Sequence, residues 1–163
     1  MRVYIGIGSN IERVANIRAA VLALRKLFSR VTFSGTYESR PIGFEGENFY
    51  NLVAAFDTDE PPETLVVILH DIEHQLGRRR GTSRFAARTI DLDLLLYGDQ
   101  VRADAALSIP RPEITEYACV LRPLAELAPE ARHPRNGETF AKLWERFDKN
   151  AQPLSPVELD LGA

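Results

Sequence analysis

The chain has 163 residues, of which 45% are hydrophobic and 26% are charged, and its formal net charge is −3. This balance is typical of a globular protein and excludes an intrinsically disordered chain. The length is sufficient for one well-buried domain but short for two, and the slightly negative charge gives no reason to expect nucleic acid as a partner. We therefore expect a single domain that spans residues 1–163.

The cysteine content and the hydropathy pattern indicate a compartment. Cys119 is the only cysteine, so an intramolecular disulfide is impossible and a reducing environment is the default. The start of the chain lacks the apolar stretch of about 7–15 residues that a signal peptide needs. No apolar run approaches the ~20 residues of a membrane-spanning helix. We expect a soluble, cytoplasmic protein with no membrane contact.

The beginning of the chain predicts a strand followed by a helix. Residues 3–7 are apolar and β-branched, which is typical of a buried strand, and Gly6 and Gly8 would let the chain turn out of it. Ser9 and Glu12 fit a capping box, so we expect the helix to begin there. Its core-facing stripe at helical spacing comprises Val14, Ile17, Val21, Leu24 and Phe28.

Similar patterns continue through the first two thirds of the chain. Residues 31–39 and 49–56 alternate in polarity and predict two strands, separated by a loop over 40–47. Two prolines then precede a second helix, which should end near Gly77. Its apolar stripe comprises Leu65, Ile68, Leu69, Ile72 and Leu76. A fourth strand is expected over residues 89–97.

This order of elements predicts the fold class. Strand–helix–strand twice over is the ferredoxin-like βαββαβ arrangement, an α+β sandwich whose antiparallel sheet carries its helices on one face. The rest of the chain is rich in proline, with short helices expected near 123–127 and 139–147. We expect a core over residues 1–129 and a C-terminal extension over 130–163. The fold hosts many functions, so function must be argued from the site residues.

The sharpest local pattern is a pair of acids in the fourth strand. Asp91 and Asp93 project from one face of that strand, while Ile90 and Leu92 enter the core. Neighbouring carboxylates repel each other and are best tolerated around a hard cation, and oxygen ligands suit Mg²⁺. The alternative is two acids on the solvated face of an amphipathic strand, which is a common pattern.

An arginine-rich stretch lies immediately before this strand. It contains Arg78, Arg79, Arg80, Arg84 and Arg88. Guanidinium groups bind phosphate through paired hydrogen bonds, and arginines beside a carboxylate pair are typical of polyphosphate transfer from ATP. The alternatives are a solvated basic surface or contacts to RNA. No aromatic-rich RNA-binding signature occurs in the sequence, so we give nucleic acid little weight.

Neither a glycine-rich phosphate loop nor a complete dinucleotide-binding fingerprint is present. The arginines and a metal ion must therefore hold ATP if it binds. Gly81, Thr82 and Ser83 lie within the basic stretch and favour a lid that closes over the nucleotide. We accordingly predict high mobility for residues 78–88 in the absence of ligand.

Two other features carry weaker signals. Phe49 and Asn51 share one face of the third strand, where a ring could stack on a flat heterocycle and a carboxamide could bind its edge. The segment His70-Asp-Ile-Glu73-His74 fits a short pattern of inverted zinc peptidases. Helical geometry directs His74 away from the core stripe, so we favour an ordinary solvated helix over a zinc site.

Together these segments resemble the 6-hydroxymethyl-7,8-dihydropterin pyrophosphokinase family of folate biosynthesis. The resemblance runs from about Tyr4 to Pro129. It rests on the segments at 4–10, 37–43, 48–51, 72–73, 77–78, 84–93 and 121–129. The spacing R-x-x-x-R-x-x-D-x-D over 84–93 is its most specific part.

The resemblance implies transfer of a pyrophosphoryl group from ATP to the pterin hydroxymethyl oxygen, with release of AMP. By position, Asp91 and Asp93 would bind two Mg²⁺ ions. The residues implied for catalysis are Arg78, Arg84, Arg88, Asp91 and Asp93. Those implied for ATP binding are Glu73, Arg78, Arg80, Arg84, Arg88, Leu94, Arg111 and Tyr117. Those implied for pterin binding are Ser39, Pro41, Ile42, Phe49, Asn51, Phe85 and Cys119.

The match is poorest over residues 109–121. The family usually has a histidine where Arg111 stands, an arginine near Tyr117 and a phenylalanine where Cys119 stands. Of these, the histidine and the arginine belong to the nucleotide side, and the phenylalanine stacks on the pterin. Phe85 likewise takes a place that usually holds a tryptophan.

Two classes of function therefore stay open. One is the ATP- and Mg²⁺-dependent pyrophosphokinase, or a paralogue of it acting on a different pterin. The other is a ferredoxin-like module that binds nucleotide or RNA without turnover. The aspartate pair favours the enzyme, because a protein that only binds anions gains nothing from two acids beside its arginines. Nothing indicates a coiled coil, so we expect a monomer that binds small-molecule substrates.

Overall fold

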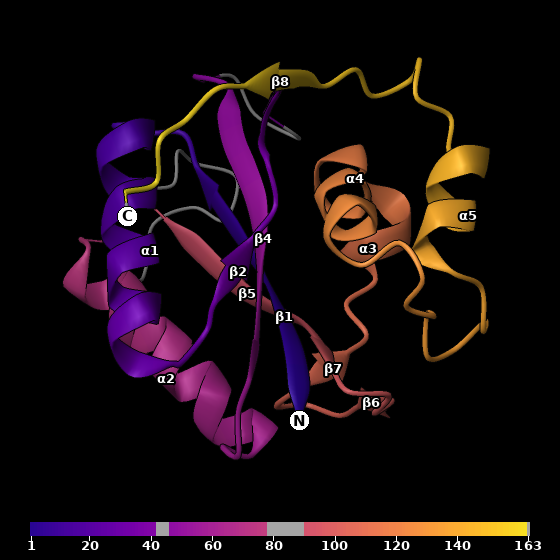
Figure 1. The fold of residues 1–163 in the computed structure, drawn as a ribbon, viewed down its shortest axis with the longest axis horizontal. Coiled ribbons are helices and arrows are strands. Elements are labelled where there is room, and N and C mark those ends of the chain that lie inside the picture. The colour runs from indigo at the N-terminus through magenta and orange to yellow at the C-terminus, as the bar shows by residue number, and fades with distance from the viewer. Residues whose placement is uncertain (42–45, 78–89, 163) are drawn as a thin grey trace.

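The computed structural model describes residues 1–41, 46–77 and 90–162 (Figure 1). Within these ranges the chain forms a six-stranded antiparallel sheet and a separate two-stranded one. The strands are β1 Arg2–Ser9, β2 Thr32–Phe33, β3 Thr36–Ser39, β4 Phe49–Asp57, β5 Asp91–Tyr97, β6 Arg102–Ala103, β7 Ser108–Ile109 and β8 Ser155–Val157. The helices are α1 Arg13–Leu27, α2 Pro62–Gln75, α3 Glu113–Glu116, α4 Ala118–Leu127 and α5 Phe140–Arg146.

The order of the strands confirms the ferredoxin-like prediction. The large sheet runs β5-β1-β4-β3-β8, with β2 also pairing with β4. The first strand therefore lies between the third and fourth predicted strands, as the βαββαβ topology requires. Each of these pairs is antiparallel.

One face of the sheet is covered by α1 and α2, which lie side by side in Figure 1. Every second side chain of the strands points toward these two helices, and the apolar stripe of each helix packs against those side chains. The fully buried members of this cluster include Ile5, Ile17, Leu24, Phe56, Leu65 and Leu69. This larger cluster is the main core of the protein.

The opposite face of the sheet is also covered, so the expectation of helices on one face only is wrong. There α4 packs on β4, α5 packs against the outer side of α4, and α3 lies beside α4 (Figure 1). Val53 and Leu95 point to this side and join Leu121, Leu124 and Phe140 in a second buried cluster. The apolar residues on both faces of β4 and β5 require this second layer, because exposed apolar surface is costly.

The start of α1 differs from the expected capping box. Ser9 is the last residue of β1, and its hydroxyl donates to the carbonyl of Ile11. The helix begins at Arg13, after Glu12 in a left-handed conformation (φ 40°). Val14 is consequently 38% exposed and is not part of the core stripe. The prediction that the helix begins at Ser9 is therefore wrong.

The predicted strand over 31–39 is two short strands, β2 and β3. They are separated at Ser34 and Gly35, where the amide of Gly35 donates a hydrogen bond to the carboxylate of Glu126 in α4. The hydroxyl of Ser34 accepts from the amide of Val53, so β4 keeps a hydrogen-bond partner across the break. The elements β6, β7, β8 and α3 were not predicted.

The C-terminal segment crosses the top of the molecule in Figure 1 and returns to α1. On the way β8 pairs with β3, at the edge of the sheet opposite to β5. Pairing of this kind protects a strand edge that would otherwise be open. Within the described ranges, none of the helices is long and apolar enough to cross a bilayer.

Candidate active site

The floor of the candidate site is formed by three neighbouring strands. In β1, Gly8 pairs with Asn51 of β4 on one side and with Asp91 of β5 on the other. One row further along, Gly6 pairs with Val53 and Asp93 in the same manner. Directly paired residues share a face of the sheet, so this register brings the amide and the two carboxylates to one side.

Gly6 and Gly8 keep that floor open. They lie within β1, so the expectation that they let the chain turn toward the helix is wrong. A Cβ atom on Gly8 would lie 3.2 Å from Oδ1 of Asn51, and one on Gly6 would lie 3.4 Å from Cδ2 of Leu95. The sequence did contain a signal for this role, because glycines two residues apart in a strand leave one face without side chains.

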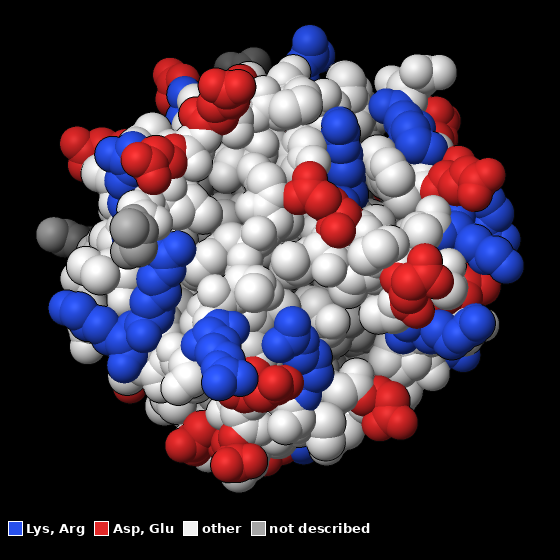
Figure 2. All heavy atoms as spheres, in the orientation of Figure 1, with Lys and Arg blue, Asp and Glu red and all other residues white. Residues whose placement is uncertain are grey.

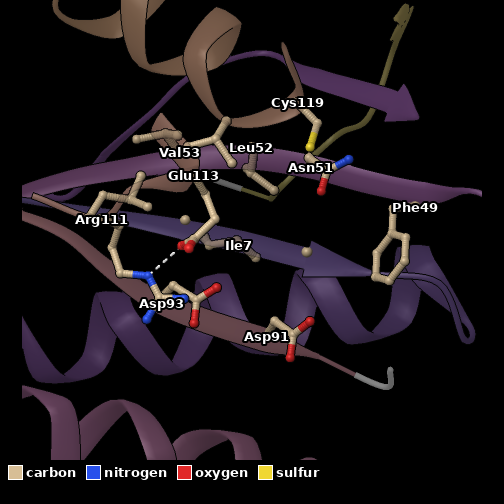
Figure 3. Close-up of a pocket in the computed structure, with 14 residues that line it drawn as sticks. Ile7, Phe49, Asn51, Leu52, Val53, Asp91, Asp93, Arg111, Glu113 and Cys119 are labelled. Carbon is tan, nitrogen blue, oxygen red and sulfur yellow. Dashed lines mark hydrogen bonds and ion pairs between the residues drawn. The ribbon is translucent and has the colours of Figure 1, made fainter. Parts of the chain in front are cut away.

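A pocket with a volume of about 130 Å³ opens over this floor (Figure 3). It brings together Phe49 and Asn51 with Asp91 and Asp93, the two pairs that the sequence singled out. In Figure 3 the aspartates project into the pocket from β5, and Cys119 reaches it from α4 above the sheet. Its complete lining is Gly6, Ile7, Gly8, Phe49, Asn51, Leu52, Val53, Asp91, Asp93, Leu95, Arg111, Glu113, Cys119 and Val120.

The position of β5 is fixed by a buried carboxylate. Among the described residues β5 is an edge strand, so alternate amides on its outer side have no strand partner there. The amide of Leu92 donates instead to Oε2 of Glu73 in α2, at 2.7 Å. Glu73 is only 4% exposed, so this bond ties the strand to the core between Asp91 and Asp93. The structure thus places Glu73 directly behind the aspartate pair.

Asp91 and Asp93 suit a hard divalent cation. Both are half-buried at the pocket wall, and they offer only oxygen atoms. Within the described ranges no group of three or more His, Cys, Asp or Glu side chains could hold a metal ion. A carboxylate pair still fits Mg²⁺, which is usually bound through one or two carboxylates together with water and substrate phosphate.

Arg111 faces these aspartates from the segment after β7. Its amide donates to the carbonyl of Leu95, and its Nε donates to Oε2 of Glu113 at 2.6 Å (Figure 3). Burial opposes the guanidinium charge, but the carboxylates of Asp93, Glu113 and Asp91 outweigh it and raise the pKa of Arg111. The arginine is therefore a permanent cation beside the aspartate pair.

A second pocket, of about 140 Å³, lies on the other side of Asp93 and Arg111. These two residues line both pockets, so they stand at the junction between them. Leu94, which the sequence placed on the nucleotide side, is also in its wall. The remaining lining residues are Val66, Leu69, His70, Leu92, Ala106, Leu107 and Ser108.

A third pocket, of about 340 Å³, adjoins the first at Cys119. It brings Ser39 and Pro41 together with Tyr117 and with residues 151–154 of the C-terminal segment. Asn51 is linked to this pocket because its Nδ2 donates to Oγ of Ser39 at 2.8 Å. Tyr117, which was expected on the nucleotide side, therefore lies beside residues expected on the pterin side.

Cys119 forms the partition between these two pockets. Burial raises the pKa of its thiol to about 11, although a hydrogen bond with Ser39 works in the opposite direction. The thiol is therefore protonated at neutral pH and acts as a small, weakly polar wall residue.

Several expected site residues lie outside the described residues: Ile42, Arg78, Arg80, Arg84, Phe85 and Arg88. The predicted mobility of residues 78–88 also falls there. The zinc pattern lies within the described part of α2, where His70 and His74 are exposed while Glu73 is buried against β5. These three side chains are thus directed to different surroundings. Besides the two glycines, sequence reasoning missed Glu113, whose only signal was its proximity to Arg111.

An aspartate pair and an arginine between two adjoining pockets have the composition of a phosphoryl-transfer centre. The sequence model of the family described as 7,8-dihydro-6-hydroxymethylpterin-pyrophosphokinase (HPPK) matches residues 4–129. The chain therefore belongs to this family, and the resemblance inferred from the sequence is confirmed.

Relatives named 2-amino-4-hydroxy-6-hydroxymethyldihydropteridine pyrophosphokinase match most of the chain. The protein from Synechocystis is 36% identical over 162 residues, covering 97% of this chain and 82% of the relative. The protein from Pseudomonas aeruginosa is 41% identical over 137 residues, covering 82% of this chain and 84% of the relative. That from Haemophilus influenzae is 34% identical over 158 residues, covering 94% and 98% respectively.

Solved structures support the fold. A Plasmodium falciparum HPPK-DHPS chain superposes with a TM-score of 0.72 at 15% sequence identity. The match covers 89% of this chain but only 45% of that one, so this chain spans less than half of the solved protein.

Proposed function

We propose that this protein transfers a pyrophosphoryl group from ATP to the hydroxymethyl oxygen of 6-hydroxymethyl-7,8-dihydropterin, releasing AMP, in folate biosynthesis. The observation that carries the proposal is that one pocket of an HPPK-family chain joins Phe49 and Asn51 to Asp91 and Asp93. A surface for a flat heterocycle and a carboxylate pair for a metal thus share a single site.

The pterin is assigned to the first pocket. Phe49 offers a ring face for stacking at one end of the pocket, and Cys119 stands on the α4 side (Figure 3). Because Nδ2 of Asn51 donates to Ser39, its Oδ1 is oriented to accept a hydrogen bond from a heterocycle N–H. Because Gly8 pairs with both Asn51 and Asp91, a pterin whose edge lies at Asn51 would have its hydroxymethyl end beside Asp91. Pro41 and Ile42 are proposed to complete this side.

ATP is assigned to the second pocket, with its phosphates extending past Asp93 and Arg111 into the first. Leu94 and Leu107 offer apolar surface for a base, and Arg111 is a charged donor at the junction. Further phosphate and nucleotide contacts are proposed for Arg78, Arg80, Arg84 and Arg88, and Phe85 is proposed to close over the pterin. Tyr117 is proposed on the pterin side, where it lines the third pocket with Ser39 and Pro41. Glu73 is proposed to support the aspartate pair from behind, because it is buried and bonded to Leu92.

In the proposed reaction the hydroxymethyl oxygen attacks the β-phosphorus of ATP. The bond between that phosphorus and the oxygen bridging to the α-phosphate breaks, AMP departs, and the hydroxyl proton is released. Asp91 and Asp93 would hold two Mg²⁺ ions, which supply neutralisation of the polyphosphate charge when bound. The protein's own part is to orient the two substrates and to place Arg111 where negative charge accumulates.

We also propose a monomeric, cytoplasmic enzyme that acts on small molecules and not on nucleic acid. The single cysteine is consistent with a reducing compartment. On the face shown in Figure 2, Lys and Arg side chains are interspersed with Asp and Glu, and no large area carries one sign of charge. Such a face offers no continuous track for a phosphate backbone. Residues 1–129 are proposed as the catalytic core and 130–163 as an extension of the same domain.

Phosphorus NMR tests this function directly. The protein is mixed with ATP, Mg²⁺ and 6-hydroxymethyl-7,8-dihydropterin, and we expect AMP and a pterin diphosphate to appear in equal amounts. Asp91→Asn serves as the control, because it keeps the size of the side chain and removes the charge. ADP in place of AMP would contradict pyrophosphoryl transfer, and ATP that binds without turnover would contradict the enzyme assignment.

A further inference from the structure

The C-terminal segment contacts the wall of the substrate pocket. After α5 it passes over α4, pairs with β3 through β8 and ends beside α1 (Figure 1). Arg18 of α1 donates to the carbonyl of Asp160 at 2.7 Å, and Arg25 donates to that of Gly162 at 3.0 Å. The segment is therefore anchored at several points to the part of the chain that the family model matches, while the segment itself lies beyond that match at residues 4–129.

One anchor of this segment lies at the junction of α3 and α4. Tyr117 is the residue before α4, and its side chain cannot cap the free amides at the start of that helix. Gln152 takes over this role from a position 34 residues away along the chain: its Oε1 accepts from the amide of Ala118 at 3.0 Å. Its Nε2 donates to the carbonyl of Glu116, the last residue of α3, at 2.9 Å.

These two bonds hold the backbone on both sides of Tyr117. Tyr117 and Cys119 line the third pocket, and Cys119 also lines the first. Ala118 between them is fully buried, so a shift of this backbone would move both side chains together. Gln152 itself lines the third pocket, which places its amide next to the wall that it fixes.

We propose that Gln152 is a positioning residue, through which the C-terminal segment sets the Tyr117–Cys119 wall of the pterin pocket. The predicted change in pterin binding rests on the proposed function, whereas the predicted change in the Tyr117–Cys119 wall does not. Because both hydrogen bonds of the amide are to backbone atoms that flank Tyr117, its loss should change pterin binding and leave the ATP side at Asp93 and Arg111 unaltered.

The single cysteine provides a readout that does not depend on catalysis. Cys119 is the only thiol in the chain, and burial keeps it protonated with a pKa of about 11. At pH 8 its alkylation by iodoacetamide should therefore be on the order of a hundredfold slower than that of a free thiol. Loosening of the wall that buries the thiol should raise this rate.

The experiment compares Gln152→Ala with Arg18→Ala. Both remove a side chain that anchors the same C-terminal segment, but Arg18 binds Asp160 at α1 and does not touch α3 or α4. Alkylation at Cys119, the KM for the dihydropterin and the KM for ATP are measured for each, well below the melting temperature. Gln152→Glu is added because it keeps an acceptor for the amide of Ala118 and loses the donor to Glu116.

We expect Gln152→Ala to alkylate about fivefold faster and to raise the KM for the dihydropterin about fivefold, as for loss of a helix cap, with the KM for ATP unchanged. Gln152→Glu should fall between wild type and Gln152→Ala, and Arg18→Ala should match the wild type. Equal alkylation rates in Gln152→Ala and Arg18→Ala would overturn the proposal. If no pterin turns over in the wild type, the proposed function fails, while the alkylation rates still decide whether Gln152 holds the wall.

Discussion

The two faces of the central sheet have different tasks although the same strands form both. On the face covered by α1 and α2, the apolar side chains of β1, β4 and β5 form one continuous core. On the other face, α4 and α5 cover Val53 and Leu95, while Asn51 and Asp91 beyond them border a pocket. The face that helices cover completely contributes stability. The face that helices cover only partway along the strands leaves room for a site.

The alternation of strand side chains explains how both tasks are combined. A period of two residues lets β5 send Leu92 to the core and Asp91 and Asp93 to the pocket. Changes on the two faces should therefore be separable. Substitutions on the pocket face should affect the reaction with the fold intact, and substitutions on the core face should do the opposite.

The largest effect is expected on the pocket face at Asp93. Asp93→Asn keeps the shape of the side chain but removes a charge from the junction of the first two pockets. We expect kcat to fall on the order of a thousandfold, because the metal and the polyphosphate lose a ligand and a counter-charge. Steady-state kinetics measure kcat, and calorimetry should show unchanged dihydropterin binding. A variant with near wild-type kcat would remove Asp93 from the reaction.

On the core face, Leu24→Ala should act on stability alone. Leu24 in α1 is fully buried among apolar residues, so truncation should lower the free energy of unfolding by about 3 kcal/mol. Urea unfolding measures this loss, and kinetics at a temperature where the variant is folded should give an unchanged KM for both substrates. A changed KM would show that the two faces are coupled.

A smaller effect is expected at the pocket floor. Gly8→Ala places a methyl group 3.2 Å from Oδ1 of Asn51, which must then shift, and we expect the KM for the dihydropterin to rise about tenfold. Gly6→Ala is the matched control on the same strand, because its methyl group would meet the flexible end of Leu95 at 3.4 Å. Equal KM values for the two variants would argue against Asn51 as a pterin ligand.

The smallest effect concerns pH and the second layer of helices. Burial and the positive charge of Arg135 lower the pKa of His133. This histidine is therefore protonated less readily in the folded state than in the unfolded state. Stability should therefore be unaffected above the ordinary histidine pKa of about 6.5 and should fall as the pH drops below it. His133→Asn keeps an acceptor for the amide of Arg135 and should flatten this dependence in thermal unfolding curves. An unchanged slope would contradict the assignment.

Local patterns predicted the part of the site that lies on regular strands. The alternation in β5 placed Asp91 and Asp93 together, and that in β4 did the same for Phe49 and Asn51. The two long helices were also predicted, except for the beginning of α1, where Ser9 completes β1 in place of capping. Strand and helix periods suffice for such elements because they depend on near neighbours in sequence.

Features that depend on distant contacts were not predictable in this way. The pairing of Gly8 with both Asn51 and Asp91 follows from the order of the strands, which local pattern does not contain. The bonds of Gln152 to Glu116 and Ala118 join segments 36 and 34 residues apart. The short helices expected near 123–127 and 139–147 correspond to α4 and α5, but their packing on the second face of the sheet was not predicted, because it depends on contacts between segments far apart in the sequence.

If the proposed function is correct, one pocket holds the pterin ring and the metal-binding carboxylates together. A crystal structure with Mg²⁺, a non-hydrolysable ATP analogue and 6-hydroxymethyl-7,8-dihydropterin tests it most directly. We expect a pterin ring against Phe49, with its edge at Asn51 and metal density between Asp91 and Asp93. A pterin bound outside this pocket, or metal held away from both aspartates, would contradict it.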